Sequence, residues 1–286
     1  MRKYNFEIVI LLFLLYYCLI ASIHLARAQS TATPIQAQGR IVYDEHFGLI
    51  LKYDTDFEDV TKIDDSKLSL TIEHSFEFGG DGGASIWIEG MDRQDGPTPH
   101  SGTRCVGMEL TDVTKSRRCE FNLQHMMELV GDEVYVSVWL YLPSDWALHG
   151  SGWNWYAIAN PFFDYNPPNY TPYTEIHINQ LNVDIEKFDV EVMGRDANFN
   201  RYTIDTVSNF PLPRGTWFHL EWYLYRHETN GKLIVWFDGQ LISNKSGLTT
   251  KLTDDYLACV GKIYHDTSDT TPHQIWVDDL EIYGSP

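Results

Sequence analysis

The sequence predicts an all-β fold, an antiparallel β-sandwich, on the strength of three observations. Residues 133–142 and 217–225 alternate between apolar and polar side chains, which is the pattern of a strand with one buried face. Turn-forming pairs such as Asp238-Gly239 separate such runs. No segment shows the apolar period of an amphipathic helix longer than about three turns. A single domain is expected, because β-sandwiches of roughly 200–250 residues are common.

The N-terminal segment is typical of a secretion signal. Arg2 and Lys3 precede an apolar run over residues 8–23, and Ala26-Arg27-Ala28 fits a cleavage site before Gln29. An uncleaved anchor is the alternative, because the run approaches the roughly 17–20 residues that span a bilayer. We therefore expect a signal peptide at 1–28, a linker at 29–40 and one domain at 41–286, in a protein that is secreted or held at the cell surface.

The charge of the chain excludes several classes of partner. Cleavage would remove three basic residues and one acidic residue, and so change the formal net charge from −19 to −21. A field of this sign disfavours nucleic acid and anionic membrane surfaces, so neither is expected as a partner of the mature protein. It also repels polyanionic sugars.

Three cysteines remain after cleavage, Cys105, Cys119 and Cys259, and an exported chain can join two of them. Cys105 and Cys119 lie in neighbouring predicted strands. Cys119 shares the parity of the apolar residues of its strand, whereas Cys105 has the opposite parity. The pairing is left open.

The predicted strands follow one another along the whole domain. They are expected at residues 68–73, 85–89, 104–110, 117–123, 133–142, 173–179, 188–193, 201–206, 217–225, 233–237, 257–264 and 275–283. Asn230-Gly231 tolerates positive φ and predicts a hairpin between two of them. In the last strand the apolar parity switches, which a bulge at Asp278-Asp279 would reconcile. Short helical turns are expected only at 123–129 and 253–257.

Residues 143–172 are predicted to be a long connection rich in aromatic side chains. Tryptophan, tyrosine and phenylalanine stand here among proline, glycine and asparagine. Connections of this length are uncommon unless they are functional, so we expect this segment to form one wall of a binding site.

The side chains of opposite parity to the core are unusual for a solvated sheet. Aromatic rings stand beside ionisable groups, and this mixture suits sugars, whose CH-rich faces stack on rings while their hydroxyls need polar partners. We expect these side chains to gather on one face as a glycan groove. The alternative is a face covered by loops, in which the rings are merely half-buried.

Three segments carry a resemblance to a known family. GTWFHLEWYLY at 215–225, NGKLIVWFDGQLI at 230–242 and QIWVDDLEIY at 274–283 resemble the concanavalin-A-like jelly roll of secreted polysaccharide lyases of the alginate, glucuronan and heparin lyase type, and of their non-catalytic relatives. The resemblance covers residues 41–286. It implies a jelly-roll sandwich that binds a polysaccharide on its concave sheet, and it specifies a fold more than an activity.

Two shorter motifs carry the chemistry that the resemblance implies. Arg118-Cys119-Glu120-Phe121 is similar to the family's R-x-E-hydrophobic strand, and Glu175-Ile176-His177 to its Q-I-H strand. By this analogy His177 abstracts the proton next to a uronate carboxylate, Arg118 neutralises that carboxylate, and a tyrosine protonates the leaving oxygen. Tyr223 is assigned to the last role from strand parity, with Tyr264 as the alternative.

The sequence departs from the family pattern in two ways. Glu175 replaces glutamine, and its charge would repel a substrate carboxylate unless it is protonated. The family's C-terminal tyrosine-lysine motif is not found. The residues expected to bind substrate are Glu120, Trp139, Tyr141, Trp155, Glu175, Asn179, Glu191, His219, Glu221 and Tyr225.

The function expected is a secreted, carbohydrate-active protein that binds a polysaccharide and cleaves a uronate-containing glycan by β-elimination. A non-catalytic glycan-binding or adhesion module is the alternative. A glycoside hydrolase is a weaker one, because only Asp189 with Glu191 and Asp184 with Glu186 have suitable spacing, and such pairs arise easily in an acidic chain.

No cofactor is required for the expected chemistry, although a structural calcium ion is compatible with the acidic clusters near the two ends of the domain. These clusters are Asp54, Asp56, Glu58 and Asp59 at one end, and Asp278 and Asp279 at the other. Plain solvation of the same carboxylates is the alternative.

Overall fold

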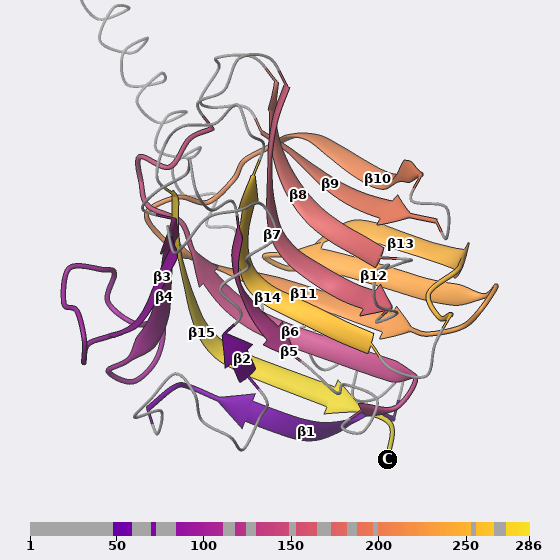
Figure 1. Ribbon diagram of the computed structural model, residues 1–286, viewed down its shortest axis with the longest axis horizontal. Helices are drawn as coiled ribbons and strands as arrows, with labels where there is room; N and C mark the ends of the chain where they lie inside the picture. Colours follow the sequence, from indigo (N-terminus) through magenta and orange to yellow (C-terminus); the bar gives the residue numbers. More distant parts are fainter. Residues whose placement is uncertain are drawn as a thin grey trace, which may run out of the picture.

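The two sheets of the predicted sandwich are both present in the computed structural model (Figure 1). The structure describes residues 48–58, 70–72, 84–110, 118–123, 130–148, 153–164, 173–181, 188–196, 200–252, 256–265 and 273–286. Every strand pair in it is antiparallel, and the all-β jelly-roll prediction is confirmed. The expected signal peptide and linker lie outside the described residues, as do most of the two expected helical turns.

The first sheet, called sheet A, has the order β13-β12-β11-β6-β15-β4-β3, with β1 paired to β15 as well. Its strands are β1 (Ile50–Thr55), β3 (Ala84–Glu89), β4 (Cys105–Leu110), β6 (Glu133–Tyr141), β11 (Trp217–Tyr225), β12 (Gly231–Phe237), β13 (Gln240–Leu248) and β15 (His273–Gly284).

The second sheet, called sheet B, has the order β10-β9-β8-β7-β14-β5-β2. Its strands are β2 (Leu70–Ile72), β5 (Arg118–Leu123), β7 (Trp153–Asp164), β8 (Tyr173–Leu181), β9 (Phe188–Arg195), β10 (Arg201–Phe210) and β14 (Tyr256–His265).

The main core lies between the two sheets and follows the predicted parity. In sheet A, Val136 of β6 pairs with Trp222 of β11, and both side chains are fully buried in this core. Sheet B contributes Ile176 and Ile178 of β8 to the same cluster. Because successive side chains of a strand point to opposite faces, the residues between these positions lie on the outer faces of the two sheets.

The two hairpin turns of the segment 217–248 differ from each other. Asp238 and Gly239 both have positive φ, of 50° and 73°, and make the expected tight turn between β12 and β13. The hairpin predicted at Asn230-Gly231 is confirmed, because β11 and β12 pair antiparallel across it. Neither residue has the positive φ that was expected, and Gly231 already begins β12. Glycine is needed there for space, since a Cβ would lie 1.9 Å from Oγ1 of Thr250.

The bulge predicted in the last strand is confirmed. The register between β15 and β6 shifts between Asp278 and Glu281, and Asp279 has a φ of 44°. Val277 before the bulge and Leu280 after it therefore both reach the main core, although their sequence parities differ.

The prediction of a long connection at 143–172 is wrong. Strand β7 occupies most of its middle and lies in the centre of sheet B, between β8 and β14. The aromatic side chains of Trp146, Tyr156 and Phe162 are buried in the main core, so they are not the wall of an open site. Two further strands, β1 and β13, were also not predicted.

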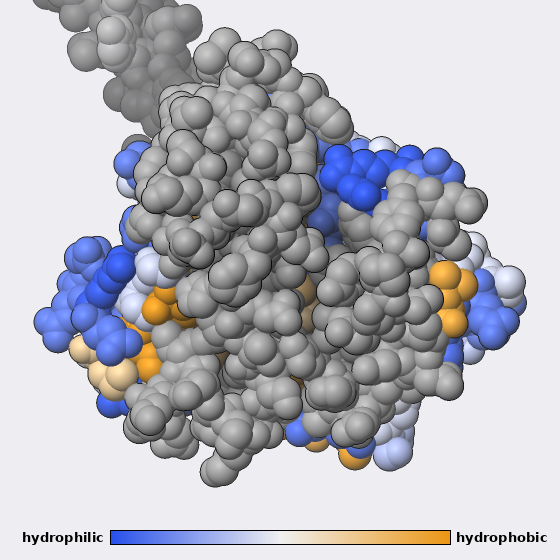
Figure 2. Space-filling view, viewed as in Figure 1, coloured by the Kyte–Doolittle hydropathy of each residue, from blue (hydrophilic) through white to orange (hydrophobic). Residues whose placement is uncertain are grey.

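Hydrophilic residues cover much of the described surface seen in Figure 2, with a few hydrophobic patches between them. The large apolar side chains that remain exposed in the described ranges include Ile50, Leu51, Leu241 and Leu252. Within these ranges, no helix has the length and apolar character needed to cross a bilayer.

Candidate functional site

A row of backbone-paired residues crosses the centre of sheet B and contains both motif residues. Arg118 of β5 pairs with Tyr264 of β14, and Tyr264 pairs in turn with Ala157 of β7. Ala157 then pairs with His177 of β8. Since neighbouring strands lie about 4.8 Å apart, the row spans about 14 Å from Arg118 to His177. For Arg118 and Tyr264 the structure describes the strand position, and their side chains lie outside the described part.

His177 is held by the glutamate two residues before it. Its Nε2 lies 2.9 Å from Oε2 of Glu175, and both side chains are almost completely buried. A carboxylate accepts hydrogen bonds, so Nε2 carries the proton and Nδ1 of the neutral ring carries the lone pair. The glutamate that replaces the family's glutamine therefore fixes the tautomer of His177.

A second polar pair lies beside His177 on the same face. Nδ2 of Asn179 donates to Oε2 of Glu191 at 2.6 Å, and Oγ1 of Thr203 donates to the other oxygen of Glu191 at 2.5 Å. Within the described ranges, Oδ1 of Asn179 is buried and has no hydrogen-bond partner. An acceptor left in this state calls for a donor that the described residues do not supply.

The other sequence candidates on this sheet are placed by backbone alone. Glu120 lies two residues after Arg118 on β5, and Trp155 of β7 pairs with Asn179. Their side chains lie outside the described part. The hydrolase pair of Asp189 and Glu191 lies on β9, where Oδ1 of Asp189 accepts a hydrogen bond from the backbone N–H of Asn209. The second hydrolase pair, Asp184 and Glu186, lies outside the described residues.

The prediction that all candidate residues share one face is wrong. Tyr223 and five of the expected substrate-binding residues lie on the outer face of sheet A instead, on the far side of the core from His177. These five are Trp139, Tyr141, His219, Glu221 and Tyr225. Packed sheets lie about 10 Å apart, and side chains on their outer faces point away from each other. The parity of a strand distinguishes side chains that face the core from side chains that face away from it. A sandwich has two outer faces, and parity does not tell on which of them a side chain lies.

Tyr223 is therefore not the proton donor for a substrate at His177. Its hydroxyl donates to Oε2 of Glu133 at 3.1 Å, within a small aromatic cluster that also contains Tyr135 and Tyr283. Burial raises the pKa of Tyr223, and the negative charge of Glu133 raises it further. Such a hydroxyl is a poor acid as well as a remote one.

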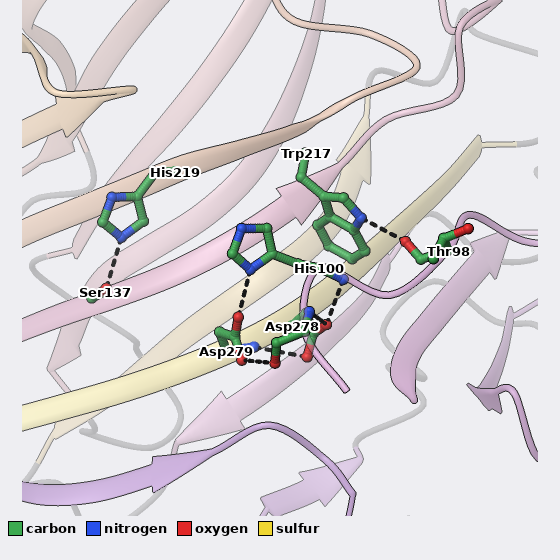
Figure 3. A network of polar contacts seen from close by, with 8 residues as sticks. Thr98, His100, Ser137, Trp217, His219, Asp278 and Asp279 are labelled. Carbon is green, nitrogen blue, oxygen red and sulfur yellow. Dashed lines mark hydrogen bonds and ion pairs between the residues drawn. The ribbon is translucent and has the colours of Figure 1, made fainter. Parts of the chain in front are cut away.

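The outer face of sheet A carries a connected network that the sequence did not predict (Figure 3). The ring of Trp139 stacks on His219 at 4.8 Å and on His100 at 3.7 Å, both with interplanar angles of 16°. Nε2 of His219 lies 2.7 Å from Oγ of Ser137. His100 belongs to the loop between β3 and β4, whose backbone at Thr98 accepts a hydrogen bond from Nε1 of Trp217. Nothing in the sequence pattern indicated that this loop lies over the sheet.

Two aspartates at the β15 bulge hold this loop. Oδ2 of Asp278 accepts the backbone N–H groups of His100 and Ser101 at 2.8 and 3.2 Å, and Asp279 contacts Nδ1 of His100 at 2.5 Å. The expected calcium ligands at this end thus have protein partners. In the described part of the chain, no group of three or more histidine, cysteine or acidic side chains is arranged to hold a metal ion. Cys105 is buried in sheet A without a disulfide bond, and Cys259 is buried in sheet B.

Asp278 predicts a measurable dependence of stability on pH. Burial raises its pKa from 3.8 to about 7, against the lowering effect of the N–H groups of Ser101, Asp279 and His100. Because the folded pKa is the higher one, the stabilisation is complete below pH 4 and is lost as the pH rises through about 7. Asp278→Asn should therefore raise the free energy of unfolding at pH 8 by about 1–3 kcal/mol and leave it nearly unchanged at pH 4.

Chemical denaturation of both proteins at pH 4, 6 and 8 measures this difference. Asn keeps an oxygen for the N–H groups of His100 and Ser101, so the loop contact is preserved. Equal free energies of unfolding of the two proteins at pH 8 would contradict the prediction, because they would show that the buried charge of Asp278 does not destabilise the fold.

Comparison with family models identifies the family of the chain. A family model described as polysaccharide lyase matches residues 70–281. No curated protein matches the chain. Among solved structures, the chain is similar to the alginate lyases Aly36B (10% identity, TM-score 0.45, covering 64% of this chain and 81% of that one) and AlyC3 (9% identity, TM-score 0.44, covering 68% and 79%).

The carbohydrate recognition domain of Emp46p is similar at the same level (9% identity, TM-score 0.44, covering 83% of this chain and 99% of that one). With TM-scores below 0.5, these structures do not bear on substrate or activity. The family match covers most of the chain, from the start of β2 to residue 281 within β15, and its range includes both motif strands. The chain therefore belongs to the polysaccharide lyase family and is a carbohydrate-active protein.

Proposed function

We propose that this protein cleaves a uronate-containing polysaccharide by β-elimination at the outer face of sheet B. The observation that carries the proposal is the row in which Arg118, Tyr264 and His177 occupy paired positions on one sheet. The row supplies a cation, a weak acid and a base, which are the three groups that β-elimination next to a carboxylate requires.

The roles follow from the chemistry of each group. His177 takes the proton from the carbon next to the uronate carboxylate, and Nδ1 is the nitrogen with the lone pair because Glu175 holds Nε2. Arg118 neutralises the carboxylate and stabilises the enolate. The bond from the next carbon to the glycosidic oxygen then breaks, a double bond forms, and Tyr264 protonates the departing oxygen.

Glu175→Gln separates the two effects of this glutamate. Glutamine still accepts the hydrogen bond from Nε2 of His177, but it removes a negative charge beside the substrate carboxylate. We therefore expect KM for a polyuronate to fall about 3- to 10-fold with little change in kcat, a gain of about 1 kcal/mol in binding. A fall in kcat with unchanged KM would mean that the charge of Glu175 serves the proton transfer itself.

Binding without cleavage is the second candidate, and a specific observation favours it. Glu175 and Glu191 place two buried carboxylates beside His177, one on its own strand and one directly opposite. Together with a net charge of −19, they oppose the approach of a polyuronate. A neutral glycan that donates hydroxyls to these oxygens is the ligand that such a site would bind.

One experiment distinguishes the two candidates. The protein is incubated with a panel of polyuronates and neutral polysaccharides, and each mixture is read for new double bonds at roughly 235 nm and for retention on the immobilised glycan. Absorbance that grows with time on a polyuronate supports the lyase. Retention on a neutral glycan without any new absorbance supports the binding module. The secretion signal expected at residues 1–28 would deliver either activity to an extracellular polysaccharide.

A further inference from the structure

Three side chains on the outer face of sheet A form a connected serine, histidine and glutamate chain. Oγ of Ser137 lies 2.7 Å from Nε2 of His219, and Nδ1 of His219 lies 3.3 Å from Oε2 of Glu221. The second oxygen of Glu221 accepts a hydrogen bond from the hydroxyl of Tyr135. All of these side chains are nearly buried, with His219 the most exposed at 9%.

The strands fix this geometry. Ser137 on β6 pairs directly with Glu221 on β11, and His219 lies two residues before Glu221 on the same face. The ring of His219 stacks on Trp139, the residue that pairs with it across the strands, so its plane is set by packing. Since the carboxylate of Glu221 faces Nδ1, a proton on Nδ1 is favoured, which leaves Nε2 to accept from the serine hydroxyl. This is the tautomer that a general base next to a serine nucleophile needs.

We propose that Ser137 is the nucleophile of an esterase site that removes small acyl groups, such as acetyl, from hydroxyl oxygens. The site lies on the opposite sheet from His177, so the inference is independent of the lyase proposal. The acyl group has to be small because Ser137 is 4% exposed and lies among the rings of Tyr135, Trp139 and His219. Sugar hydroxyls of an acylated glycan are the natural alcohol for a carbohydrate-active protein.

The reaction balances without an added cofactor. Oγ of Ser137 bonds to the ester carbonyl carbon while its proton moves to Nε2 of His219, and Glu221 stabilises the imidazolium. The bond from the acyl carbon to the alcohol oxygen breaks, and the alcohol leaves with the proton from His219. Water then attacks the acyl carbon, gives a proton to His219, and releases the carboxylic acid as Ser137 recovers its proton.

The loop that carries His100 packs against this site. The ring of His100 stacks on Trp139, the same ring on which His219 stacks. Asp279 contacts Nδ1 of His100 and holds the loop in this position.

The test uses the full mature chain with two probes. Hydrolysis of p-nitrophenyl acetate is followed by release of p-nitrophenolate, and a fluorophosphonate is used to label the reactive serine, which is located by peptide mass. We expect hydrolysis above the rate of free imidazole and one adduct, on Ser137. Ser137→Ala should lower the hydrolysis rate at least about 100-fold and remove the adduct. Glu221→Gln should lower the hydrolysis rate by a similar factor.

Ser243 provides the matched control, since it is also a buried serine in sheet A but has no hydrogen-bond partner for Oγ within the described ranges. Ser243→Ala should retain both hydrolysis and the adduct on Ser137. Thermal unfolding of each variant shows whether a loss of activity reflects a loss of fold. The proposal is overturned if folded Ser137→Ala hydrolyses the ester as fast as the wild-type protein, or if the fluorophosphonate labels another serine or none.

Discussion

Replacing His177 with alanine is expected to lower the formation of unsaturated product from a polyuronate by about 10²- to 10⁴-fold, the usual contribution of a general base. His177 is the imidazole of the paired row on sheet B, and Glu175 leaves Nδ1 as the basic nitrogen. The measurement is the initial rate of absorbance at roughly 235 nm under saturating substrate, compared with the wild-type protein. The loss should lie mainly in kcat, because the proton transfer occurs only in the transition state.

The fold of this variant has to be checked, because alanine leaves the buried carboxylate of Glu175 without the imidazole. His177→Gln is the second variant, since its amide still donates to Glu175 but cannot accept a proton from carbon. Both variants should lose activity, and only the alanine variant should lose stability. His227→Ala, at the β11–β12 turn, is the matched histidine control and should keep full activity. If folded His177→Gln retains activity within tenfold of wild type, the base lies elsewhere.

Tyr264→Phe is expected to lower kcat about 10²- to 10³-fold, whereas Tyr223→Phe should change it less than threefold. Both substitutions remove a single hydroxyl oxygen, so they are matched in size. They differ in position, because Tyr264 pairs with Arg118 on sheet B while Tyr223 lies on the outer face of sheet A. A proton donor must come within hydrogen-bond reach of the departing oxygen, and only the first tyrosine shares a sheet with His177.

The comparison is made with the same substrate at two or three pH values, together with unfolding curves for both variants. Tyr223→Phe loses a hydrogen bond to Glu133, so a small loss of stability without a loss of rate is its expected signature. The opposite result, with Tyr223→Phe inactive and Tyr264→Phe active, would move the elimination chemistry to sheet A. It would also remove Arg118 from the mechanism.

Two of the strand predictions show what the periodicity of apolar residues can and cannot detect. The parity switch between Val277 and Leu280 predicted a bulge, and Asp279 adopts the left-handed conformation that a bulge of this kind requires. Strand β7 was missed because its own alternation is broken. Its register with β8 shifts twice, between Ala157 and Ala159 and between Ala159 and Phe162, and Pro161 lies inside it. A period-two search finds regular strands and passes over bulged ones.

The role of Glu175 was also beyond the sequence. From the sequence alone, the charge of Glu175 would repel a substrate carboxylate, and this argued against catalysis. In the fold it lies 2.9 Å from His177 on the same face of β8, where a carboxylate selects the tautomer of that histidine. Residues two apart on a strand always share a face, but whether they touch depends on rotamers and on what packs over them.

The sequence by itself determined which side chains of each strand avoid the core, because alternation along an extended chain is a local property of the backbone. Only the tertiary structure decided which of the two outer faces each of them joins. Strand order is set by contacts between segments far apart in the chain, such as β5 with β14 and β6 with β11. For that reason His177 and Tyr223, which have equivalent sequence patterns, lie on opposite sides of one hydrophobic core.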